Sequence, residues 1–158
     1  MNKINDLITP EQLENKPASI RIDFYNLAEI EVHFEGQFSD VIGLGADIYS
    51  ALAEEVIEKE LLDFIIFDRS KMLRLKFGHE LPRQRRGFID FKIDEKSEIA
   101  ANINGHGIAL AIGYQQFIED VCTKYDLSYK EYVELIKDNY ECWKNSDKKR
   151  IFKEALKK

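Results

Sequence analysis

The alternation of apolar and polar residues near the start of the chain predicts a pair of strands. Apolar residues occupy every second position of residues 20–25, and the same alternation returns in residues 30–35. A period of two residues is typical of a strand that buries one face and exposes the other to water. Because only a short link, residues 26–28, connects the two segments, we expect an antiparallel hairpin with one solvated face.

Four further segments are also expected to form strands. Residues 64–67 are a compact apolar run rich in β-forming side chains, and residues 72–77 follow after a short polar link. Residues 88–93 and 99–103 alternate again, on either side of a turn. Together with the first hairpin, these segments predict a mainly antiparallel sheet of about five to six strands.

Helical spacing of apolar residues predicts the remaining elements. Such spacing runs from about residue 46 to residue 60 and again from residue 110 to residue 125. Ser128 and Glu131 have the spacing of a capping box, which opens a further helix, and residues 147–158 are expected to form a last, basic one. This order of elements predicts an α+β fold in which the sheet is packed with helices and the C-terminal part is helical.

The length and composition indicate one folded unit. A chain of 158 residues suits a single globular domain spanning residues 1–158, and its 44% hydrophobic and 33% charged content is that of a folded protein. We expect residues 1–17, in which a short helix begins near Thr9, and residues 147–158 to be loosely attached to this domain.

The sequence carries no sign of export or of membrane insertion. No apolar run approaches the roughly 18–20 residues needed to span a membrane, and the first residues lack the apolar core of a signal peptide. The two cysteines, Cys122 and Cys142, are therefore expected to be free thiols in a reducing compartment. We predict a cytoplasmic protein that has no membrane partner.

Charge adds information because it is sorted along the chain. The formal net charge is −6, but residues 1–68 carry 15 acidic and 4 basic side chains, and residues 69–96 carry 4 acidic and 9 basic ones. A segregated charge creates a field that can select a partner by its sign. The acidic balance also argues against a general nucleic-acid binder, because phosphate contacts need clustered positive charge.

The acidic part of the chain supplies the first candidate site. Between Glu29 and Asp68, eleven carboxylates stand against one basic residue, Lys59. Some fall on one face of an expected strand, and others fall on one face of the helix expected at residues 46–60. Such a surface either keeps the protein solvated or binds a basic protein. The candidate partner-binding residues are Glu29, Glu31, Glu35, Asp47, Glu54 and Glu58.

A basic segment supplies the second candidate. Arg83, Arg85 and Arg86 lie in an expected loop between Phe77 and Phe88. Guanidinium groups beside aromatic rings can bind single-stranded nucleic acid or a phosphorylated ligand. The alternative is a solvated loop whose arginines pair with the acidic half of the protein itself, and the net negative charge favours this alternative.

The third candidate is an enzymatic site at His106. This histidine and the nearby Asn102 and Asn104 form a polar group before an expected helix, and an imidazole that titrates near neutral pH can act as a general acid or base. No carboxylate or nucleophile can be named as its partner, and Asn104-Gly105 is equally typical of a turn. A structural role for His106 is therefore favoured.

Other patterns of functional chemistry are incomplete. Gly43-Leu44-Gly45 precedes the helix expected from residue 46, but a dinucleotide-binding fingerprint would need a third glycine where the chain has Ile48. We interpret this segment as a structural turn. The three histidines and two cysteines lack the spacing of a metal site, so neither a metal nor a cofactor is predicted.

The small size, the acidic charge and the missing catalytic motifs together resemble the small acidic immunity proteins that bacteria pair with secreted toxins. Those proteins are commonly single-domain and cytoplasmic, and many occlude a basic nuclease toxin with an acidic face. Anti-defence proteins that imitate nucleic acid share the same profile. The resemblance implies a non-catalytic inhibitor that binds a basic protein, such as a cognate toxin domain.

Overall fold

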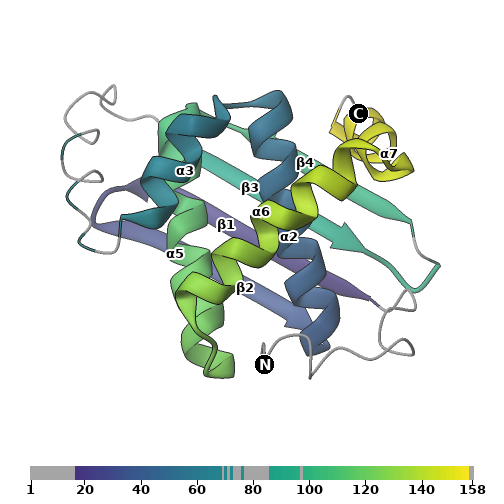
Figure 1. Cartoon of the computed structure of the whole chain (residues 1–158), viewed down its shortest axis with the longest axis horizontal. Helices are drawn as coiled ribbons and strands as arrows, with labels where there is room; N and C mark the ends of the chain where they lie inside the picture. The colour runs from purple at the N-terminus through teal and green to yellow at the C-terminus, as the bar shows by residue number, and fades with distance from the viewer. Residues whose placement is uncertain are drawn as a thin grey trace.

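The fold combines one antiparallel sheet with a layer of helices (Figure 1). The computed structural model describes residues 17–68, 70, 72, 76, 86–96 and 98–156. Within these residues the sheet has four strands in the order β2-β1-β3-β4, and each strand is antiparallel to its neighbours. The strands are β1 (Ala18–Asn26), β2 (Glu29–Gly36), β3 (Gly87–Ile93) and β4 (Ile99–Asn104). The α+β class with a helical C-terminal part is as predicted.

The sheet buries one face because its strands alternate. In β1, Ile20, Ile22 and Phe24 are buried, whereas the residues between them are only partly covered. The hairpin of β1 and β2 is confirmed, and Ile22 lies opposite Val32 in β2 and Ile89 in β3. The predicted strands at residues 88–93 and 99–103 are confirmed as β3 and β4.

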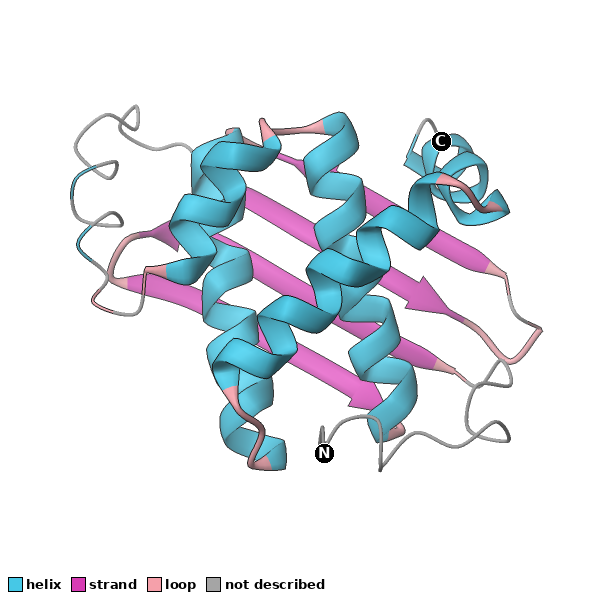
Figure 2. Ribbon diagram, viewed as in Figure 1, coloured by secondary structure: helices cyan, strands magenta, loops and turns pink. Residues whose placement is uncertain are grey.

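The helices lie over the buried face of the sheet (Figure 2). The helices are α2 (Phe38–Glu55), α3 (Lys59–Phe67), α5 (Gly107–Tyr125), α6 (Tyr129–Lys144) and α7 (Asp147–Leu156). Both α2 and α5 pack on the central strand β1, and α6 crosses over α2 on the side away from the sheet. Helix α3 packs on α5, and α7 packs on β4. One of the two hydrogen bonds of the predicted capping box is confirmed: the Ser128 side chain accepts a hydrogen bond from the amide of Glu131.

The expected count of five to six strands is too high. Residues 64–67, predicted as a strand, belong to helix α3, in which Leu62, Ile65 and Ile66 are buried at helical spacing. Of the strand expected at residues 72–77, only positions 72 and 76 are described, and both are helical; the others lie outside the described residues. The sheet therefore has four strands in the described part of the chain.

Helix α2 begins eight residues before the predicted start at residue 46, at Phe38. The segment Gly43-Leu44-Gly45 lies inside this helix, so the predicted structural turn is wrong. Gly45 is where α2 meets α5 and α6, because a Cβ atom there would clash with the Tyr132 hydroxyl and lie 2.9 Å from the ring of Phe117. The glycine allows these helices to approach closely.

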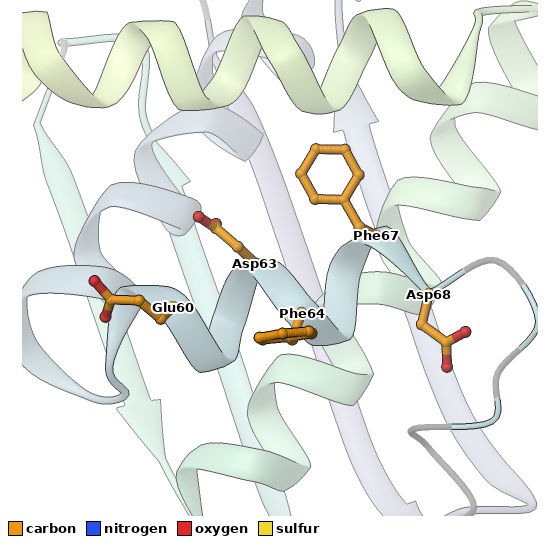
Figure 3. A pocket seen from close by; sticks show the side chains of 5 residues that line it. All are labelled: Glu60, Asp63, Phe64, Phe67 and Asp68. Atoms are coloured by element: carbon orange, nitrogen blue, oxygen red, sulfur yellow. The ribbon is translucent and has the colours of Figure 1, made fainter.

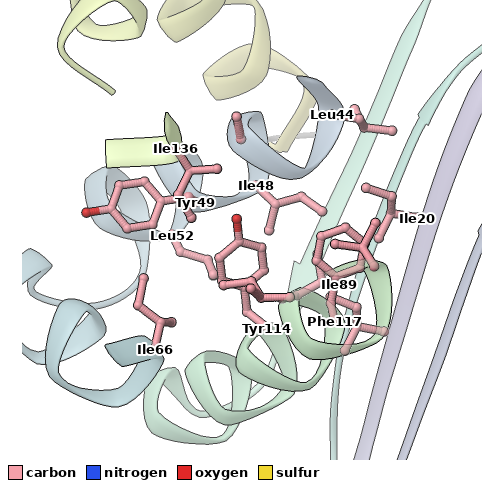
Figure 4. Packing of buried hydrophobic residues seen from close by; sticks show 14 of the residues in the cluster. Ile20, Leu44, Ile48, Tyr49, Leu52, Ile66, Ile89, Tyr114, Phe117 and Ile136 are labelled. Atoms are coloured by element: carbon pink, nitrogen blue, oxygen red, sulfur yellow. The ribbon is translucent and has the colours of Figure 1, made fainter. Parts of the chain in front are cut away.

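Buried tyrosines connect the helices through the core (Figure 4). The hydroxyl of Tyr114 donates to the carbonyl oxygen of Gly45 at 2.6 Å, and the hydroxyl of Tyr132 donates to that of Ile42 at 3.3 Å. These bonds satisfy hydroxyl groups that would otherwise be buried without partners. Burial also raises the pKa of Tyr114 well above its usual range.

The last helix contacts the core through one buried aromatic side chain. Phe152 of α7 is 1% exposed, stacks on Phe91 of β3 with ring centres 5.3 Å apart, and lies 6.3 Å from the ring of Trp143. Residues 147–156 are therefore packed on the sheet, where we expected loose attachment. Residues 1–16, with the helix expected near Thr9, and residues 157–158 lie outside the described residues.

Candidate functional site

The face of the sheet opposite the helices is not covered by any described element (Figure 2). We call this surface the open face. Every second residue of each strand points to it, as the registers of the four strands require. Its central residues are Ser19, Arg21, Asp23, Tyr25, Glu29, Glu31, His33, Glu35, Phe88, Asp90, Lys92 and Asn102.

Arg21 is the centre of the open face, and its charge is used within the sheet. Its guanidinium lies 2.8 Å from Asp23 on the same strand and 3.2 Å from Asp90 on β3, and it covers the ring of Phe88 at 4.4 Å. The hydrogen bonds that Arg21 donates to Asp23, followed by the charges of both carboxylates, raise the pKa of Arg21. Asp23 and Asp90 are thus paired with a neighbouring cation, whereas the glutamates of β2 on this face form no ion pair with a described residue.

Three of the predicted partner-binding residues form one exposed row on β2. Glu29, Glu31 and Glu35 alternate along the strand, all three are exposed, and no described residue forms an ion pair with them. We call these three residues the acidic strip. Alternation along a strand places their carboxylates on one side, as the sequence predicted.

Tyr25 lies at the end of the open face next to the acidic strip. The charge of Glu31 is the main cause that raises the pKa of Tyr25, with further contributions from Asp23 and Glu29. The guanidinium of Arg86 lies 5.4 Å from the centre of its ring. Tyr25 is thus a half-exposed aromatic residue among carboxylates. The sequence pattern did not single it out as a candidate site residue, because the pattern placed Tyr25 only as one polar position of a strand.

The remaining acidic candidates are separated from the acidic strip. Asp47 is 4% exposed inside the helical layer, so the expectation that it faces solvent is wrong. Glu54, also in α2, accepts a hydrogen bond from the hydroxyl of Tyr140 at 2.9 Å. Glu58 is exposed, but α2 ends before it, and it occupies the position that precedes α3. The predicted helix face of three solvated carboxylates is therefore not formed.

Asp47 pairs with a residue of the last helix. Its Oδ1 lies 3.4 Å from Nζ of Lys148, and burial raises the pKa of this carboxyl to about 6 although Lys148 lowers it. The two residues are 101 positions apart, so the pair could not be read from local sequence patterns.

The arginine candidates can be placed only in part. Arg83 and Arg85 lie outside the described residues. Arg86 is exposed and lies over the ring of Tyr25, next to the acidic strip. Its described surroundings therefore include carboxylates, which repel phosphate groups.

His106 has a structural role in the described part of the chain. It is the residue that precedes α5, and its Nδ1 accepts a hydrogen bond from the amide of Ile108 at 3.2 Å. Gly105 before it has a φ of +132°, a conformation that favours glycine and fits the predicted turn at Asn104-Gly105. The described residues contain no group of three His, Cys, Asp or Glu side chains that could hold a metal ion.

A pocket of about 570 Å³ lies along the outer side of α3 (Figure 3). Its described lining residues are Glu60, Asp63, Phe64, Phe67 and Asp68. Asp63 is already used, because it accepts hydrogen bonds from Tyr49 at 2.5 Å and from Lys59 at 3.1 Å and lies 3.4 Å from Lys137. Lys137 also covers the ring of Phe67 at 4.9 Å. These contacts hold α3 against α2 and α6, and the side chains of Asp63 and Phe67 point towards α6 in Figure 3.

The comparisons with known proteins give no guide to this site. No family model, no curated protein and no solved structure matches the chain. No helix in the described part of the chain is both long enough and apolar enough to cross a membrane. The function is therefore argued from the geometry of the open face.

Proposed function

We propose that this chain is a non-catalytic binding protein that captures a basic protein through the open face of its sheet. The activity of that partner, such as the toxin of an immunity pair, would be blocked by occlusion. The acidic strip steers the partner towards the sheet, and the partly exposed rings of Tyr25 and Phe88 supply apolar contact area on the same face.

The exposure of the acidic strip carries the proposal. Its three carboxylates project from a sheet face that no described element covers, and no described cation forms an ion pair with them. Uncompensated charges on one face repel each other, which lowers the stability of the isolated protein. A basic partner removes that repulsion, and the same field increases the rate of encounter.

The proposal is tested by charge reversal on two surfaces. Tagged protein captures its partner from the source cells, and the association rate of the purified partner is then measured at low salt. Replacing Glu29, Glu31 and Glu35 by Lys should slow association by at least about tenfold. The control replaces Glu55, Glu134 and Asp138, which are exposed on the helical side, by Lys.

The control is informative because both triple variants change the net charge by the same amount. Equal slowing in both would mean that only total charge matters, and an unchanged rate in the strip variant would remove the proposed site.

A labelled single-stranded oligonucleotide tests the alternative that the chain binds nucleic acid. Saturable binding at physiological salt that is lost on Arg83, Arg85 and Arg86→Ala would instead favour the phosphate-binding alternative.

A further inference from the structure

Strand β2 is at the edge of the sheet. It pairs with β1 on one side, and no described strand pairs with its other side. An edge strand directs the N–H and C=O groups of alternate residues away from the sheet, where they can pair with another extended chain. The outer edge of β2 is therefore a line of backbone donors and acceptors beside the acidic strip.

The two faces of β2 differ in chemistry. The acidic strip lies on the open face, whereas Ile30, Val32 and Phe34 alternate with it and lie half-buried against the core. Lys124 of α5 covers the ring of Phe34 with its Nζ 4.9 Å from the ring centre. A strand added here would meet carboxylates on the open face, and apolar side chains with one cation on the helical face.

A second copy of the same strand fits this edge poorly. When residues 29–35 of β2 are paired antiparallel with the same residues of a second copy, Glu29 lies opposite Glu35. Shifting the register by two residues either way places Glu31 opposite itself or opposite Glu35. Like charges directly opposite each other in a sheet are destabilising, so self-pairing is disfavoured in all three registers.

We propose that β2 accepts an extended segment of a basic partner as an added strand of the sheet. Lysine or arginine side chains at alternate positions of that segment lie opposite the acidic strip, and the apolar side chains between them extend the row of Ile30, Val32 and Phe34. Lys124 fixes this orientation, because basic side chains on the helical face would be repelled there. The inference rests on the proposed function and specifies how the partner is held: backbone hydrogen bonds give affinity, and alternate side chains give specificity.

The test uses the complete protein and synthetic peptides. The probe is a blocked peptide of alternating lysine and valine, about seven residues long. Two matched versions carry N-methyl groups either on all lysines or on all valines. In an extended strand all lysine N–H groups point to one edge and all valine N–H groups to the other, so only one version loses the donors that face β2.

Edge pairing predicts unequal binding of the two methylated peptides. In a calorimetric titration at low salt, one should bind at least about tenfold more weakly than the parent and the other within about twofold of it. Glu29, Glu31 and Glu35→Gln should weaken the parent peptide, and a glutamate–valine peptide should not bind. Amide hydrogen exchange in β2 should slow when the parent peptide is added.

Equal affinities of the two methylated peptides would overturn the added strand. If the Gln variant still weakened the parent peptide in that case, the acidic strip would bind cations from the open face alone, and the proposed function would stand. Absence of saturable binding by the parent peptide would also overturn the added strand. The proposed function would then be judged by the captured partner and the two charge-reversal variants.

Discussion

Lys148 of α7 lies 3.4 Å from the buried carboxylate of Asp47 in α2, and this pair links the C-terminal helix to the centre of the helical layer. Lys148 is half-exposed, so water also solvates its charge, whereas Asp47 has lost nearly all contact with water. Desolvation of the carboxylate therefore outweighs the attraction of the lysine, and the pKa of Asp47 rises to about 6.

The raised pKa of Asp47 predicts a specific dependence of stability on pH. The folded protein binds the Asp47 proton more tightly than the unfolded chain, whose ordinary value is 3.8. The resulting stabilisation is complete below that value and is lost as the pH rises through about 6. Asp47→Asn keeps a neutral side chain at every pH, so its free energy of unfolding should gain about 2–3 kcal/mol relative to wild type between pH 4 and pH 7.

Urea unfolding at several pH values measures this difference, and a second variant checks its cause. Lys148→Gln removes the charge and the hydrogen bond that lower the pKa of Asp47, so its stability should fall more steeply with pH than that of wild type. Parallel pH profiles for wild type and Asp47→Asn would show that this carboxyl is not desolvated in solution.

The two glycines of α2 predict opposite effects of the same substitution. Gly45→Ala places a methyl group against Phe117 and the Tyr132 hydroxyl, and overpacking of this kind costs about 1–3 kcal/mol. Gly43→Ala is the matched control, because a Cβ atom there meets nothing within 4 Å. It should raise the free energy of unfolding by about 0.5–1 kcal/mol, since alanine favours helix more than glycine does. Destabilisation of similar size in both variants would contradict the close approach at Gly45.

Phe152 provides a test of how firmly α7 is attached. Its ring is buried between Phe91 and Trp143, so Phe152→Ala should cost about 3–5 kcal/mol in urea unfolding. Ile151→Ala, at a half-buried neighbour on the same helix, should cost clearly less. A loss below about 1 kcal/mol for Phe152→Ala would mean that α7 is frayed in solution, as the sequence suggested.

Local sequence patterns predicted the elements in which burial follows a clear period. The alternation in residues 20–25 and 30–35 was sufficient for the hairpin, and the open face of polar residues follows from the same alternation. Residues 64–67 were predicted wrongly because four consecutive apolar residues fit a strand and a helix equally well. Only the packing of Ile65 and Ile66 into the core, with Phe64 67% exposed, distinguishes the two.

The part of the candidate site that lies on a single strand could be predicted from the sequence. The acidic strip could be found because its spacing of two residues fixes one face. The position of Asp47 could not be predicted, because its partner Lys148 is distant in sequence and because α2 begins before the two glycines, Gly43 and Gly45, that were interpreted as a turn. Tyr25 gained its significance only when the hairpin placed it beside Glu31.

Tyr25 and Glu31 should affect different steps in the binding of the proposed partner. Glu31 contributes long-range attraction, so Glu31→Gln should slow association, and the difference from wild type should shrink as salt screens charges beyond about 8–10 Å.

Tyr25 offers a half-exposed ring that acts only after contact, so Tyr25→Ala should raise the dissociation rate by at least about tenfold and leave association nearly unchanged. Tyr25→Phe keeps the ring and is the control; it should dissociate much more slowly than the alanine variant. Surface plasmon resonance with the captured partner separates the two rates. If Tyr25→Ala dissociated at the wild-type rate while remaining folded by circular dichroism, the contact would lie elsewhere on the acidic surface, and the open face would lose its role as the centre of the interface.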